Sequence, residues 1–202
     1  MSAGRRGLMA ALLVLAALWL AGCSSTPTRG PGGGGVPASS GADGPPPPGS
    51  PDPMTVPDAE PRVEPIRQGG PNKPYEVMGQ TYVPMTTDAP LVERGLASWY
   101  GRKFHGRPTA SGELYNMHTM TGAHKTMPIP SYARVRNPAN GREVIVRIND
   151  RGPFAKERVI DVSWAAAVRL GIERGVREVE VQRITRSEEH TSELQSRLHL
   201  VC

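Results

Sequence analysis

One stretch decides the fold: Ala133-Arg-Val-Arg-Asn-Pro-Ala-Asn-Gly-Arg-Glu-Val-Ile-Val-Arg-Ile-Asn-Asp150. Apolar side chains occupy alternate positions on both sides of the central Asn-Pro-Ala-Asn-Gly segment, whose composition is typical of a turn. This pattern predicts a β-hairpin with one buried face. The second strand ends at Asp150, which opens an Arg-Gly-Pro turn from which a carboxylate can project into a groove.

The hairpin belongs to a longer region of the same character, residues 95–184. Short β-branched runs alternate there with Gly, Pro and Asn, as in small all-β domains. A short helix is predicted at residues 164–170, where Ser163 can cap its start and Gly171 can end it. A last strand follows, in which apolar and polar residues alternate. Several short strands in about 90 residues favour a closed barrel, because closure removes exposed strand edges.

The chain is much longer than this domain. Its 202 residues include 23 Gly and 21 Pro, whereas a compact domain of about 100 residues is near the usual size. We therefore expect one folded domain and a long unfolded portion. The chain has a net charge of +5, and its basic residues are scattered through the domain and not massed in one run. This distribution indicates a solvated surface and argues against a nucleic-acid partner.

Residues 1–22 predict a signal peptide. Two arginines precede an apolar run, residues 8–20, which is too short to cross a bilayer comfortably. The run leads into Leu20-Ala-Gly-Cys23, which resembles the bacterial lipobox, where the cysteine carries a diacylglycerol and its amino group is acylated. Such a lipid anchor at Cys23 would hold the protein at a membrane durably. Ser24 is typical of Gram-negative lipoproteins of the outer membrane, and we expect this location, facing the periplasm.

Two segments separate the cysteine from the domain. Residues 23–72 contain runs of Gly and Pro, which cannot bury enough apolar surface to offset the entropy of ordering, so we predict a disordered tether. Residues 73–94 are predicted to form an accessory hairpin and a connector, because two short β-type runs flank Met78-Gly-Gln80.

Six motifs of the domain, in order, resemble the rare lipoprotein A family: Ala97-Ser-Trp-Tyr-Gly101, Phe104-His-Gly106, Thr109-Ala-Ser-Gly-Glu113, Ala123-His-Lys-Thr126, Asn149-Asp-Arg-Gly-Pro153 and Ile160-Asp161. The resemblance implies a six-stranded double-psi β-barrel with one or two short helices at residues 95–184. It also implies a lytic transglycosylase, a lyase that cleaves the MurNAc–GlcNAc β-1,4 bond of peptidoglycan and leaves a 1,6-anhydromuramyl end. Some members prefer strands without stem peptides. Glycan strands and division-site proteins are the implied partners, and we expect a monomer.

This reaction needs one carboxyl group, which protonates the leaving oxygen and then accepts the proton of the muramyl 6-hydroxyl. Its pKa must be raised, so the site must be partly buried. We predict Asp150 as this acid/base. Glu113 and His124 match family positions implied to assist cleavage, and Asp161 is the alternative acid because its place resembles that of the catalytic aspartate in related barrel glycosidases.

Structural roles remain open for the same residues. An Asp before Arg-Gly-Pro is often a turn former, Asp161 can cap the following helix, and a single histidine more often packs in a core than serves a reaction. Tyr100 and Phe104 are predicted to stack on sugar rings, with core packing as the alternative.

Thr109 and Ser111 complete the predicted substrate-binding residues. No cofactor or metal is expected, because the histidines lack metal-ligand spacing and cysteine companions; they are His105, His118 and His124. A second functional reading remains, a non-catalytic, expansin-like module that binds or loosens the wall. Residues 185–202 resemble a translated sequencing adapter, so we expect a tail that is not native, with a short native helix as the alternative.

Overall fold

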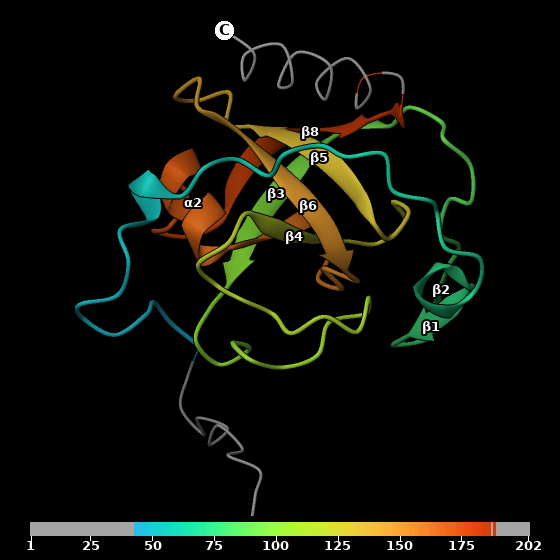
Figure 1. Ribbon diagram of the computed structural model, residues 1–202, viewed down its shortest axis with the longest axis horizontal. Coiled ribbons are helices and arrows are strands. Elements are labelled where there is room, and N and C mark those ends of the chain that lie inside the picture. Colours follow the sequence, from blue (N-terminus) through green and yellow to red (C-terminus); the bar gives the residue numbers. More distant parts are fainter. Residues whose placement is uncertain (1–42, 187, 189–202) are drawn as a thin grey trace, which may run out of the picture. The chain divides into compact units, whose positions relative to one another are not determined.

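A computed structural model describes residues 43–186 and residue 188, and six of its strands close into a barrel (Figure 1). These strands are β3 (Val92–Tyr100), β4 (Thr121–His124), β5 (Ser131–Arg136), β6 (Glu143–Asp150), β7 (Arg158–Ser163) and β8 (Arg177–Ile184). Their order around the barrel is β3-β7-β4-β6-β5-β8. β3 with β7 and β4 with β6 run parallel, and the other neighbours run antiparallel. The predicted mainly β, closed six-stranded barrel is confirmed.

The period-two pattern of the sequence fills the inside of this barrel. Val135 pairs with Val144, and Ala133 pairs with Val146, so that apolar side chains from β5 and β6 face the same core. All four are at most 1% exposed, and each fully buried Val contributes roughly 1.5–3 kcal/mol to folding. The hairpin predicted from residues 133–150 is therefore confirmed.

The short helix α2 (Trp164–Leu170) lies where the sequence predicts it. The Ser163 side chain caps its start by accepting a hydrogen bond from the backbone N–H of Ala166, and Gly171 ends it in the left-handed conformation with a φ of 71°. The helix buries three alanines and Leu170.

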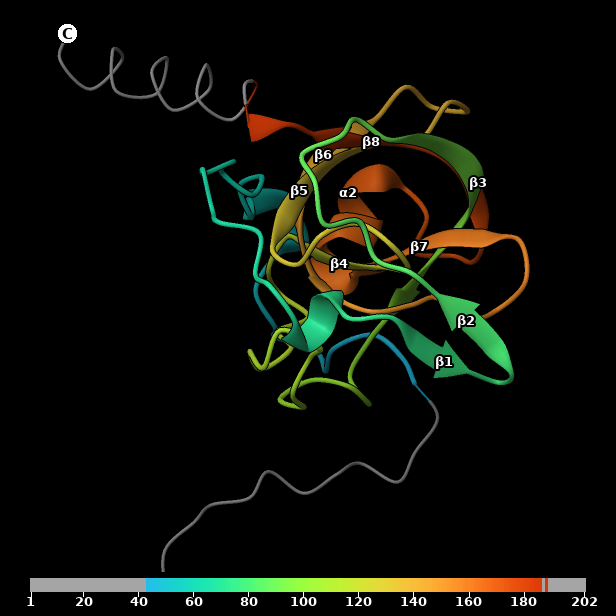
Figure 2. The same ribbon diagram turned by 90° about the vertical axis from the view of Figure 1, so that its right-hand side faces the viewer.

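The accessory hairpin is also confirmed, as β1 (Tyr75–Val77) and β2 (Gln80–Tyr82) joined by a two-residue turn. It stands outside the ring of barrel strands (Figure 2). Its two tyrosine rings stack at 5.3 Å between centroids, and both contact Phe154, which follows β6. The hairpin thus packs on the loop after Asp150.

Residues 43–72, which we call the strap, differ from the expected disordered tether. Figure 1 shows the strap crossing the barrel, and it contains the short 3-10 helices η1 (Pro53–Thr55) and η2 (Gly70–Asn72). The Asp43 carboxylate accepts hydrogen bonds from the backbone N–H groups of Gly101 and Lys103 at 2.9 and 3.0 Å. Asp58 pairs with Arg169 at 2.7 Å. Composition suggested disorder because the strap has little apolar surface, but polar side chains fix it at separate points.

Other expectations lie outside the described residues: the signal peptide, the lipid-bearing Cys23, the tether at residues 23–42, and the tail beyond residue 188. The barrel itself begins at Val92, three residues earlier than expected. Within residues 43–186 and 188, no helix is long and apolar enough to cross a membrane.

Candidate active site

Two aspartates lie at the same level of the barrel, on the two strands that flank β4. β4 lies between β6 and β7, and its Ala123 pairs with Asp150 on one side and Asp161 on the other. The register between β4 and β6 shifts between Gly122 and Ala123, because β6 advances there by two residues, from Ile148 to Asp150. Asp150 therefore stands at this level. Two strand spacings separate the aspartate backbones by about 10 Å.

Both aspartates open into one cleft of about 510 Å³. Aromatic and apolar side chains form much of its lining, together with Arg158; those used below are Met78, Tyr100, Phe104, Phe154 and Arg158. The structure thus brings Asp150, Asp161, Tyr100 and Phe104 together, four of the residues that the sequence predicted as site residues.

Asp150 keeps one carboxylate oxygen available. Its Oδ1 accepts hydrogen bonds from the backbone N–H groups of Ala110 at 2.9 Å and Arg151 at 2.8 Å, whereas its Oδ2 accepts none from the described residues. Burial raises the pKa of Asp150, and this effect exceeds the opposing effects of the two N–H groups and of the Arg151 charge. The group is therefore suited to hold a proton at Oδ2.

Asp161 has a partner at each oxygen. The Ser98 hydroxyl donates to Oδ1 at 2.6 Å, and an Arg158 nitrogen lies 3.6 Å from Oδ2. Burial raises the pKa of Asp161, although Ser98 and Arg158 oppose the rise. The helix-cap role considered for Asp161 belongs to Ser163 instead. Both candidate acids therefore have raised pKa values, but only Asp150 combines this with a free oxygen.

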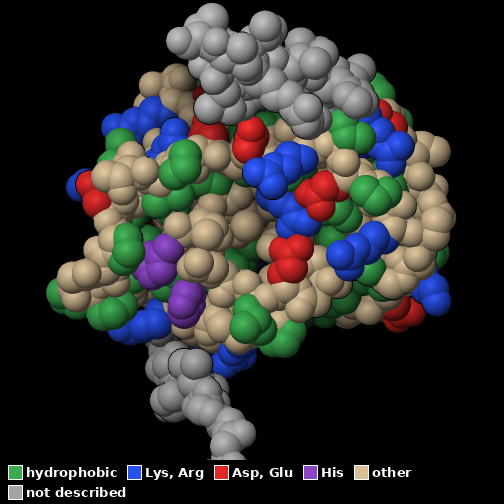
Figure 3. All heavy atoms as spheres, in the orientation of Figure 1, with side chains coloured by type: hydrophobic (Ala, Val, Ile, Leu, Met, Phe, Trp, Pro, Cys, Tyr) green, Lys and Arg blue, Asp and Glu red, His purple; other side chains and the backbone are tan. Residues whose placement is uncertain are grey.

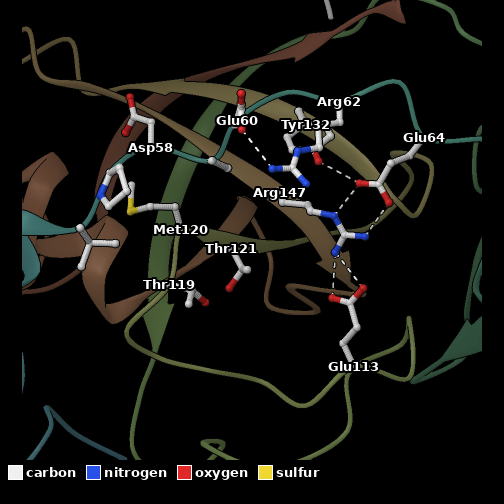
Figure 4. Close-up of a pocket in the computed structure, with 13 residues that line it drawn as sticks. Asp58, Glu60, Arg62, Glu64, Glu113, Thr119, Met120, Thr121, Tyr132 and Arg147 are labelled. Atoms are coloured by element: carbon white, nitrogen blue, oxygen red, sulfur yellow. Dashed lines mark hydrogen bonds and ion pairs between the residues drawn. The ribbon is translucent and has the colours of Figure 1, made fainter. Parts of the chain in front are cut away.

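Glu113 lies in a second cavity, of about 790 Å³, between the strap and the barrel (Figure 4). Arg147 donates to both of its carboxylate oxygens at 2.8 Å, and Asn149 donates at 3.1 Å. Burial alone would raise the pKa of Glu113, but the hydrogen bonds from Asn149 and Arg147 outweigh it and lower the pKa. Glu113 is thus kept ionised, outside the cleft that holds the aspartates.

The loop of residues 109–113 contacts residues of both cavities: it carries Glu113, which lines one, and it bonds Asp150, which lines the other. Its Ala110 N–H donates to Asp150, and its Ser111 N–H donates to the carbonyl of Asn149 at 3.0 Å. The hydroxyls of Thr109 and Ser111 bond each other at 2.9 Å. Neither residue lines either cavity, so the structure places these two predicted substrate-binding residues inside a loop that positions Asp150.

His124 is 1% exposed and does not line the cleft. Its Nδ1 accepts the backbone N–H groups of Thr126 at 3.2 Å and Met127 at 3.0 Å, and its Nε2 lies 3.3 Å from Glu93. Because Nδ1 accepts, the ring proton is carried by Nε2, which can donate to Glu93. The backbone carbonyl of His124 accepts a hydrogen bond at 3.1 Å from Arg151, which lines the cleft.

The two predicted aromatic residues differ in exposure. Tyr100 is 8% exposed and stacks on Tyr115 at 4.1 Å between ring centroids, and burial raises its pKa well above the usual range, so that it stays neutral. Phe104 packs edge-on against Tyr100 and is 40% exposed. Phe104 is therefore the more accessible of the two rings, and Tyr100 packs against it.

Sequence reasoning missed Arg151, which joins the hairpin base to the barrel. Its guanidinium donates to the carbonyls of Pro71, His124 and Met127 and to the side-chain oxygen of Asn72, at 2.6 to 3.1 Å. Burial lowers its pKa to about 10, which still leaves it charged at neutral pH. The sequence signal that could have pointed to Arg151 is the presence of a charged residue inside the Asn149-Asp-Arg-Gly-Pro153 turn motif.

Charges elsewhere on the surface are mixed. On the face shown in Figure 3, basic and acidic side chains are interspersed and do not form one basic patch. Within the described residues, no group of three or more His, Cys, Asp or Glu could hold a metal ion.

A protein-family model described as lytic transglycolase matches residues 92–181, which span the barrel from β3 into β8. Among curated proteins, the chain is similar to Endolytic peptidoglycan transglycosylase RlpA of Vibrio cholerae, with 48% identity over 131 residues, 64% of this chain and 49% of that protein. The protein of the same name from Pseudomonas aeruginosa is 47% identical over 182 residues, 85% of this chain and 52% of that protein. That from Neisseria meningitidis serogroup B is 53% identical over 114 residues, covering 56% and 48%. The chain spans about half the length of these curated relatives.

Proposed function

Through its double-psi β-barrel this chain belongs to the lytic transglycolase family, and on that premise we propose that it is an endolytic transglycosylase that cleaves peptidoglycan glycan strands. The observation that carries the proposal is Asp150 in the cleft, with a raised pKa and a free Oδ2. A carboxyl group of this kind can serve as both acid and base in one reaction cycle.

The chemistry follows from one carboxyl group. Protonated Asp150 donates its Oδ2 proton to the oxygen of the MurNAc–GlcNAc bond, and the bond between that oxygen and muramyl C1 breaks. The muramyl 6-hydroxyl oxygen bonds to C1, and its proton passes to Oδ2, which restores the acid. The products are a free GlcNAc 4-hydroxyl and a 1,6-anhydromuramyl end, and no water is consumed. Strands without stem peptides are the proposed preferred substrate.

Glu113 and His124 then act through position. Glu113 accepts hydrogen bonds from Arg147 and Asn149, both of β6. Glu113 belongs to the same loop as Ala110, whose N–H donates to Asp150 Oδ1. His124 offers its carbonyl to Arg151, which follows Asp150 directly. Both would tune where the acid lies without touching the sugar.

The experiment uses purified sacculi and amidase-stripped sacculi, with mass spectrometry for 1,6-anhydromuramyl products. We expect such products from the wild type and from Asp161→Asn at a reduced rate, and none from Asp150→Asn. Loss with Asp161→Asn alone would make Asp161 the acid. Sedimentation of the wild type with glycan, without any anhydro product, would instead support the non-catalytic, expansin-like wall-binding function.

The location is also a proposal: a monomer anchored by lipid at Cys23 to the outer membrane and facing the periplasm. It is supported by the lipobox-like Leu20-Ala-Gly-Cys23 and by Ser24. Metabolic labelling with palmitate, followed by separation of inner and outer membranes, tests it. Label on the wild type but not on Cys23→Ala, in the outer-membrane fraction, is the expected result, and unlabelled wild type would refute it.

A further inference from the structure

The turn of the β1–β2 hairpin carries a methionine where the backbone favours another residue. Val77 pairs with Gln80, so Met78 and Gly79 are the two turn residues, and both have positive φ, 52° and 73°. Turns of this type strongly prefer Asn or Gly at the first position, because a bulky side chain crowds the following carbonyl in this conformation. The Met78 side chain is also 91% exposed. Neither turn geometry nor packing therefore accounts for it.

The hairpin is fixed against the barrel and cannot be a loose appendage. The Tyr75 hydroxyl donates to the carbonyl of Lys125 at 2.9 Å, and the Met85 N–H donates to the carbonyl of Thr126 at 2.8 Å. Both acceptors directly follow β4. At the hairpin base, Arg151 holds the strap as described above. The turn is thus held at a set position relative to Asp150.

That position is the wall of the active-site cleft. Met78 and Phe154 line the same cleft as Asp150 and Asp161, as does Phe104. The rings of Tyr75 and Tyr82 contact Phe154 and support it. Met78 and Phe154 offer methylene, thioether and aromatic surface to this cleft, and a flexible thioether adapts to irregular apolar surfaces.

We propose that Met78 and Phe154 form a sugar subsite, which binds the pyranose ring next to the one whose bond is cleaved at Asp150. The inference rests on the proposed function and names how the same cleft holds its substrate. A pyranose has C–H faces that fit apolar and aromatic surface, while its hydroxyls stay at the rim. An enzyme that cuts inside a strand must hold rings beyond the reacting bond, and a fixed wall beside Asp150 can do so.

The subsite binds the substrate away from the reacting atoms, so its contribution is the same in the ground state and the transition state. Such uniform binding changes KM and leaves kcat nearly constant. Burial of a methionine side chain by a ligand is large enough to change the affinity by roughly tenfold.

The test is Met78→Asn in the full-length chain in detergent, with Met78→Leu as the conservative variant and Val83→Asn as the matched control. Val83 is 65% exposed and does not line the cleft. For Met78→Asn we expect a roughly tenfold higher KM for amidase-stripped glycan strands with kcat within about twofold. Its melting temperature should be unchanged or higher, because Asn suits the turn. Met78→Leu should restore KM, and Val83→Asn should leave it unchanged.

A second measurement separates this inference from the proposed function: sedimentation of the Asp150→Asn protein with uncleaved glycan strands, with and without Met78→Asn. If the wild type makes no anhydro ends but Met78→Asn still weakens sedimentation, the lytic function fails and the subsite stands. The inference is overturned if Met78→Asn folds normally and changes neither KM nor sedimentation, or if it lowers kcat alone.

Discussion

Asp150 and Asp161 flank Ala123 from opposite sides of β4, at the same level of the barrel. They share one cleft, and burial raises the pKa of both. They differ in their partners: two backbone N–H groups on one oxygen of Asp150, a hydroxyl and a guanidinium on separate oxygens of Asp161. This difference lets the roles be separated by changing a residue that touches only one of them.

Ser98→Ala should leave the pH dependence of kcat unchanged. The Ser98 hydroxyl donates to Asp161 at 2.6 Å, and a hydrogen bond to a carboxylate lowers its pKa. Its loss raises the pKa of Asp161 further and leaves the partners of Asp150 in place. With Asp150 as the acid, the alkaline limb of the profile, measured by anhydro-product formation, stays where it is. A limb that moves to higher pH would identify Asp161, and Ser98→Thr, which keeps the hydroxyl, should not move it.

Asp150→Asn should stabilise the fold increasingly as pH rises. The folded pKa of Asp150 is raised above the ordinary 3.8, so between the unfolded and folded pKa values the native state binds more protons than the unfolded state. The slope of the free energy of unfolding with pH has the sign of the number of protons bound in the unfolded state minus the number bound in the native state. This difference is negative here, so the wild type loses stability as pH rises through that window. Asn resembles the neutral form and still accepts the two N–H groups. In urea unfolding from about pH 3 to pH 7, the free energy of unfolding of the variant should increase relative to that of the wild type. A difference between the two that stays constant with pH would mean that the pKa of Asp150 is not raised.

The sequence allowed the barrel to be predicted because its signals are local. The alternating valines of β5 and β6, the Ser163 cap and the Gly171 stop each act within a few residues. The two aspartates could be named from their motifs for the same reason. That they stand beside Ala123 at one level could not, because their position depends on the strand order and on a register shift between β4 and β6.

The strap and the true place of Glu113 depend on distant partners. Nothing within the Gly- and Pro-rich strap indicates that Glu64 meets Arg147, or that Asn72 holds the backbone of Ile129. A buried His124 was one of the two readings open from sequence, and its Nδ1 contacts with Thr126 and Met127 decide its orientation. Contacts made across many residues leave no periodic pattern to read.

Arg151→Lys should weaken both stability and glycan binding. Four acceptors depend on the guanidinium fork, and a lysine ammonium cannot reach all of them, which leaves buried carbonyls unpaired at a cost of roughly 2–4 kcal/mol. The hairpin base loosens, so KM for glycan strands should also rise. The control is Arg94→Lys, whose ion pair with Glu180 is on the surface and 75% exposed at the arginine, and which should change unfolding by under about 0.5 kcal/mol. Equal effects of both variants would contradict the role of Arg151 in joining the hairpin base to the barrel.

Glu64→Gln should destabilise the protein and lower activity, although Glu64 is far from Asp150 in sequence. Its carboxylate accepts two hydrogen bonds from Arg147, at 2.7 and 2.9 Å, and one from the Tyr132 hydroxyl at 2.8 Å (Figure 4). Arg147 in turn holds Glu113. Loss of this partly buried, bidentate pair should lower the free energy of unfolding by roughly 1–3 kcal/mol. Arg62→Gln removes a pair with Glu60 that is 70% exposed at the arginine, and should leave the free energy of unfolding nearly unchanged. Chemical unfolding and anhydro-product rates measure both effects; a stable Glu64→Gln protein with full activity would show that the strap does not support the loop that positions Asp150.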